Sequence, residues 1–88
     1  MPRYFFNVYD GRDIIDDLGA ELPNCTFARR EAIRYSGALL EEESTKLALG
    51  EDWRMEVTDS VGLILFVLNF TVLASAAVPQ AGLIPAER

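Results

Sequence analysis

The sequence contains no histidine and only one cysteine, Cys25, among its 88 residues. These absences exclude a zinc site of Cys and His ligands, a disulfide within one chain and an imidazole general base. No serine has a histidine partner, and no glycine-rich segment matches a phosphate-binding loop. A chain this short also has little room for a substrate cavity. We therefore expect a non-enzymatic protein with no catalytic residue, cofactor or metal site.

Basic residues are also few. Eight Lys and Arg stand against fourteen Asp and Glu, which gives a formal net charge of −6. Binding to nucleic acid depends largely on Lys and Arg that displace counterions from phosphates. A nucleic-acid partner is therefore not expected.

The chain has no apolar run long enough for a membrane span. The segment that most resembles a span, residues 63–78, has 16 residues without a charge and includes Asn69, Thr71 and Ser75, whereas a spanning helix needs about 20 predominantly apolar residues. Arg3 and Asn7 interrupt the apolar residues of segment 1–9, which is typical of a strand and not of a signal peptide. We expect a cytoplasmic protein, and membrane association through residues 63–78 is a less favoured alternative.

One sequence pattern occurs twice. Residues 3–22 and residues 53–70 each begin with an aromatic and β-branched run, continue through Asp-x-x-Gly and end in a second apolar stretch. The turns are expected at residues 16–19 (DDLG) and 59–62 (DSVG), because Asp and Gly are favoured in turns. The pattern predicts two β-hairpins. Asp10-Gly11 offers a further turn, and the second strand, at Ile14 and Ile15, is expected to be brief.

A helix is expected between the two hairpins. Asn24 is the best N-cap, since its side-chain oxygen can accept a hydrogen bond from the first turn, and Thr26 is the alternative cap. The helix is expected from about residue 25 to residue 49, with Gly50 as its stop. The stripe expected to face the sheet comprises Ala28, Ala32, Tyr35 and Leu39.

Together these elements predict the α+β class, with the order ββαββ and a four-stranded antiparallel sheet that carries one helix on one face. The single domain is expected over residues 1–72. Residues 73–88 form a small-residue tail that is either loosely ordered or completes a dimer. The expected core includes Phe6, Leu39, Trp53, Val57 and Phe66.

The last predicted strand is apolar on both faces. Alternation places Ile64, Phe66, Leu68 and Phe70 inward and leaves the residues between them outward. One helix cannot cover both faces, and an exposed apolar patch marks an interaction surface. We expect a homodimer, with another protein as a further candidate partner. The expected interface residues are Leu63, Leu65, Val67, Val72 and Leu73.

Three arginines near the start of the helix offer an alternative function. Arg29, Arg30 and Arg34 lie beside free backbone N–H groups, which together can hold a phosphate or a carboxylate. An anion or small-ligand binder is therefore the alternative, while a solvated face with salt bridges is the favoured interpretation. The acidic residues of the first hairpin lack the spacing of a calcium loop and are expected to serve its turns.

The residues also carry a family resemblance. The opening MPRYFFNVYDG, the ELPN entry into the helix and the closing strand with its Asp-x-x-Gly turn lie within residues 1–70. In these features the chain resembles a family of short uncharacterised proteins of rhizobial-type α-proteobacteria, a domain of unknown function. That family brings no known activity, so the resemblance implies no site residues.

Overall fold

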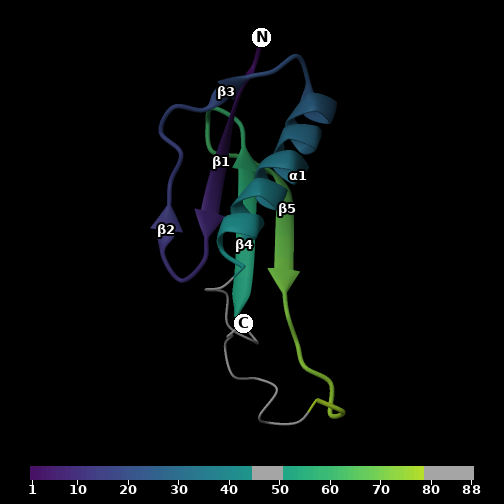
Figure 1. The fold of residues 1–88 in the computed structure, drawn as a ribbon. Coiled ribbons are helices and arrows are strands. Elements are labelled where there is room, and N and C mark those ends of the chain that lie inside the picture. Colours follow the sequence, from purple (N-terminus) through teal and green to yellow (C-terminus); the bar gives the residue numbers. More distant parts are fainter. Residues whose placement is uncertain (45–50, 79–88) are drawn as a thin grey trace.

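The computed structural model describes residues 1–44 and 51–78 of the chain. Within them five strands form one antiparallel sheet, and one helix lies across one face of it (Figure 1). The α+β class with an antiparallel sheet is therefore confirmed. In chain order the elements are β1 (Arg3–Tyr9), β2 (Asp13–Ile14), β3 (Ala20–Glu21), α1 (Cys25–Glu42), β4 (Asp52–Thr58) and β5 (Ile64–Thr71).

The sheet has five strands instead of four because the predicted second strand is divided. The strand order is β2-β1-β4-β5, and β3 pairs with β1 on the edge that β2 also occupies. β2 and β3 have two residues each, and the chain between them leaves the ladder to make the turn at Asp16. β1 and β4 form the centre of the sheet.

The core lies between the helix and the covered face of the sheet. Side chains of β1 and β4 alternate between buried and partly exposed, as a strand with one buried face requires. Two fully buried alanines let the helix approach the sheet closely. The buried apolar residues are Tyr4, Phe6, Val8, Ala28, Ala32, Trp53, Met55 and Val57, and the expected Leu39 and Phe66 pack against them while partly buried.

The helix begins as predicted and ends earlier. The Asn24 side chain accepts a hydrogen bond from the Phe27 N–H at 3.2 Å, which confirms the N-cap. Helix α1 ends at Glu42 instead of near residue 49. Glu41 to Glu43 place negative charge at the C-terminal end of the helix, where the helix dipole disfavours it. The predicted stop, Gly50, lies outside the described residues.

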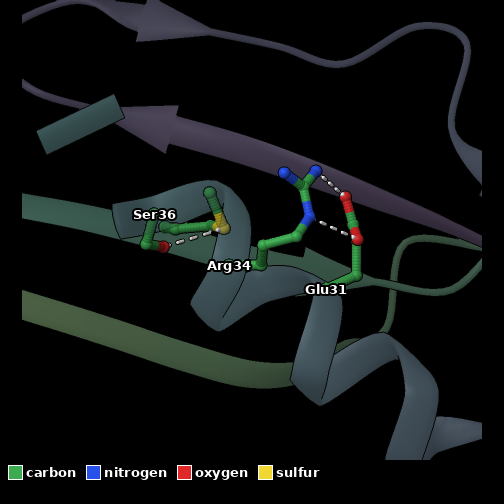
Figure 2. Close-up of polar contacts among 4 residues, drawn as sticks. Glu31, Arg34 and Ser36 are labelled. Carbon is green, nitrogen blue, oxygen red and sulfur yellow. Dashed lines mark hydrogen bonds and ion pairs between the residues drawn. The ribbon is translucent and has the colours of Figure 1, made fainter. Parts of the chain in front are cut away.

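The buried face of the helix includes Ser36, whereas the predicted stripe contained Tyr35 instead. Ser36 is 6% exposed, and its Oγ donates to the Met55 Sδ at 3.5 Å (Figure 2). Tyr35 was expected there, but it is 37% exposed and meets the Phe6 ring edge-on at the border of the core. A small side chain fits this position because the long Met55 side chain already fills the space beneath the helix.

The second Asp-x-x-Gly turn forms where it was predicted, whereas the first does not reverse the chain. β1 turns into β2 at residues 10–12, where the Asp10 N–H donates to the Arg12 carbonyl at 3.2 Å. β2 and β3 both run antiparallel to β1, so residues 16–19 form a bend between them. Gly19 and Gly62 adopt positive φ angles of 71° and 90°. In the second turn the Asp59 carboxylate accepts hydrogen bonds from the N–H groups of Val61 and Leu63, at 3.0 and 2.9 Å. Asp therefore holds the turn, and Gly provides the left-handed backbone.

A β-bulge in β5 changes which of its side chains face the core. Val57 pairs with Phe66, but the next residue, Thr58, pairs with Ile64, so Leu65 is an extra residue. Ile64 therefore lies opposite Thr58 on the uncovered face, where it is 49% exposed, although it was expected inside. Leu65 was expected outside, and it packs against the core.

Candidate functional site

The two edges of the sheet differ, and the difference defines the candidate site. The edge beyond β1 is covered by β2 and β3. Arg3 donates to the Leu18 carbonyl at 2.8 Å and forms an ion pair with Glu21 at 3.1 Å along this edge. Asp13 in β2 and Asp17 in the turn add further charge. Charges and short strands are the devices by which proteins keep a sheet edge from pairing with another chain.

Asp16 fills the gap in this covered edge. Its Oδ2 accepts a hydrogen bond from the Phe6 N–H at 3.1 Å, while its Oδ1 accepts from Leu18 and Gly19 at 3.1 and 2.9 Å. Its own N–H donates to the Asn7 Oδ1 at 2.9 Å. Burial raises the pKa of Asp16, but the three backbone donors outweigh it and hold the pKa below the ordinary value. The carboxylate thus replaces the missing strand.

The opposite edge, β5, is open. β5 ends the strand order, and no strand within residues 1–44 and 51–78 pairs with its outer side (Figure 1). Its sequence, ILFVLNFT, contains no charge and no proline, and no charged residue occurs anywhere in residues 63–78. Six large apolar side chains on and beside it are exposed: Leu63 61%, Ile64 49%, Val67 48%, Phe70 41%, Val72 39% and Leu73 76%. We call these six residues the β5 patch.

The β5 patch contains four of the five expected interface residues. Leu65 is excluded, because the bulge turns it toward the core. Sequence alternation missed Ile64, which was expected inside. Phe70 lies opposite Trp53 on the covered face, as alternation predicts, but it is 41% exposed there. Phe70 and Val72, with Leu40 and Ser44 at the end of the helix, line a shallow apolar hollow of about 220 Å³. No signal in the sequence predicts the bulge.

The three arginines are not gathered into one site. Arg34 is held by Glu31 through two hydrogen bonds of 3.1 and 2.6 Å (Figure 2). The hydrogen bond from Arg34 lowers the pKa of Glu31. The Arg30 guanidinium lies over the Phe27 ring, 5.3 Å from its centroid. Arg29 is exposed and lies about 100° around the helix from Arg30. The geometry therefore does not favour an anion site.

The acidic residues of the first hairpin are separated by the fold. In the part of the chain that the structure describes, no group of three or more acidic or cysteine side chains could hold a metal ion. The Asp10 carboxylate lies 4.0 Å from the Arg12 guanidinium, while Asp16 serves the turn. Asp10 also borders a second hollow of about 170 Å³ with Gly11, Glu51 and Asp52.

Within residues 1–44 and 51–78, no helix has the length and apolar character needed to cross a bilayer.

Comparison with known proteins agrees with the expectation of a domain of unknown function. A family model described as "Domain of unknown function (DUF6894)" matches residues 3–71, from the start of β1 to the end of β5. Searches of curated proteins and of solved structures find no match. The matched segment contains every strand and the helix described above. The chain therefore belongs to the DUF6894 family, a domain of unknown function.

Proposed function

We propose that this protein is a non-enzymatic interaction module that forms a homodimer through the β5 patch. One observation carries the proposal: an edge strand without charge or proline exposes six large apolar side chains beside it. Monomeric proteins usually protect such an edge, as this chain does at β1.

The size of the β5 patch supports self-association. Six side chains with exposed fractions from 39% to 76%, on both faces beside the edge strand, together present roughly 500 Å² of apolar surface, near the upper end of what a soluble monomer exposes. Together with the adjoining backbone, this approaches the area of about 800 Å² that each partner gives to an ordinary interface. A twofold axis would bury each patch against its copy, which is the commonest arrangement of a small homo-oligomer.

The charge distribution also favours a second copy of the same chain. Each copy carries a formal charge of −6, so most of the surface repels its copy. The β5 patch has no charged residue and lets two copies meet without direct repulsion. An additional protein partner would compete for the same patch and would dissociate the dimer.

The setting of the dimer is part of the same proposal. We place it in the cytoplasm of an α-proteobacterium, because residues 1–70 resemble proteins of those bacteria. The single cysteine is consistent with a reducing compartment, since it offers no disulfide within one chain.

Two matched lysine substitutions test the proposal. Val67→Lys places a charge in the β5 patch, opposite Glu56 of β4, so a folded monomer is expected. Leu18→Lys is the control, because Leu18 is 77% exposed on the covered edge and gains the same charge. Light scattering after gel filtration should show a monomer for Val67→Lys and a dimer for the wild type and Leu18→Lys. A dimeric Val67→Lys would contradict the proposal.

A further inference from the structure

We infer that the two copies pair edge to edge, with β5 antiparallel to β5 of the second copy, so that one continuous sheet runs through the dimer. This inference rests on the proposed function and adds the manner of assembly. Its starting point is the contrast between the charged, covered edge at β1 and the uncharged, open edge at β5.

The backbone of β5 offers the pairing groups. In an antiparallel sheet, about half of the residues of an edge strand direct their N–H and C=O groups away from the neighbouring strand. β5 has eight residues, and within the described chain these outward groups meet no other strand. Antiparallel pairing about a twofold axis matches the donors of one copy with the acceptors of the other. The edge is therefore complementary to itself.

The register of β5 limits how the copies can pair. The bulge at Leu65 interrupts the ladder near the start of β5, so residues 66–71 form its regular part. A twofold axis perpendicular to the sheet keeps every side chain on its own face. Val67 can therefore face Val67 or Asn69 of the second copy, but it cannot face Phe66. Both helices must then lie on the same face of the joint sheet.

Packing of the two uncovered sheet faces against each other is the competing arrangement. The centre of that face is polar, because Arg54 bonds to Glu56 at 3.1 Å and stacks on the Tyr9 ring at 4.6 Å. A face-to-face dimer would bury this charged pair, at a desolvation cost that the apolar residues beside it would have to offset. Edge pairing leaves the pair in contact with water.

Edge pairing also separates the like charges of the two copies. Glu56 lies on β4, so three strand spacings, about 14 Å, would separate it from the β4 strand of the second copy. That distance exceeds the screening length of about 8 Å at physiological salt. The acidic character of the chain is therefore no obstacle to this arrangement.

Amide hydrogen exchange measured by NMR tests the inference. The wild type is compared with Val67→Lys, the expected monomer, and amides of β4 serve as the internal control. The β5 amides that bond to β4 should be protected from exchange in both proteins. The alternate β5 amides, which point away from β4, should exchange at least about tenfold more slowly in the wild type than in Val67→Lys. A wild-type dimer whose alternate β5 amides exchange as fast as in Val67→Lys would overturn edge pairing and leave the proposed dimer standing. A monomeric wild type would overturn both.

Intermolecular NOEs provide a second readout that does not need the variant. In a mixture of ¹³C-labelled and unlabelled wild-type chains, edge pairing predicts contacts between backbone protons of residues 66–71 of the two copies. A dimer whose intermolecular contacts join only side chains of the uncovered face would contradict the inference.

Discussion

The carboxylate of Asp16 accepts a hydrogen bond from the backbone N–H of Phe6 at 3.1 Å, in the gap between β2 and β3. A side chain thereby takes the place of a strand residue at the edge of the sheet. Because the same carboxylate also holds the N–H groups of Leu18 and Gly19, it fixes both the turn and the covered edge.

Asp16→Ala should therefore destabilise the domain by about 1 to 3 kcal/mol, since three backbone donors lose their acceptor. Asp17→Ala is the matched control, because Asp17 is an exposed neighbour in the same turn, and its change should stay within about 0.5 kcal/mol. Urea unfolding measures both. Equal effects of the two substitutions would show that the Asp16 hydrogen bonds contribute nothing specific.

The stability that Asp16 provides should depend on pH. Its pKa is lowered in the folded state from an ordinary value of 3.8. The stabilisation is therefore complete above that ordinary value and is lost as the pH falls through the lower folded pKa. The difference in unfolding free energy between wild type and Asp16→Asn should shrink between pH 5 and the most acidic pH at which both proteins still fold. A constant difference over this pH range would contradict the claim that the ionised Asp16 carboxylate provides the stabilisation.

The two turn glycines should respond differently to alanine. A Cβ at Gly62 meets nothing within 4 Å, so the only strain in Gly62→Ala comes from the positive φ angle. This substitution should lower the free energy of unfolding by about 1 to 2 kcal/mol. A Cβ at Gly19 would lie 2.8 Å from the Tyr4 carbonyl oxygen and 2.9 Å from the Phe5 ring. Gly19→Ala should therefore cost about 3 kcal/mol or more. Thermal unfolding measures the stability of both variants. Equal losses of stability would mean that the backbone at Gly19 can move away from β1.

Gly37→Ala should stabilise the protein. Gly37 is an exposed residue inside α1, and an added Cβ meets nothing within 4 Å. Alanine in place of glycine in a helix interior gains about 0.5 to 1 kcal/mol. A higher midpoint in urea with an unchanged dimer mass is expected. A loss of stability would indicate that another chain packs closely against this part of the helix.

The sequence was sufficient for the class of the fold because its strongest signals are local. Alternation in β1 and β4, the Asn24 cap and the two Asp-x-x-Gly turns each depend on a few neighbouring residues. The structure confirms all of them except the first Asp-x-x-Gly turn, which bends the chain between β2 and β3 without reversing it. Ser36 was missed because its role depends on the Met55 side chain, 19 residues away.

The candidate site was predicted only in part, and the reason is again physical. Alternation assumes an unbroken ladder, and one extra residue at Leu65 exchanges the faces of the residues before it. Ile64 therefore joined the exposed patch and Leu65 left it. That β5 would be an open edge could not be foreseen, because no local signal in the sequence indicates the order of the strands in the sheet.

Sedimentation equilibrium of the wild-type protein at micromolar concentration tests the central claim most directly. Burial of the β5 patch against its copy predicts a mass of twice 9.8 kDa, with dissociation toward the monomer on dilution. A protein that remains at 9.8 kDa over the full concentration range, while folded, would contradict the account.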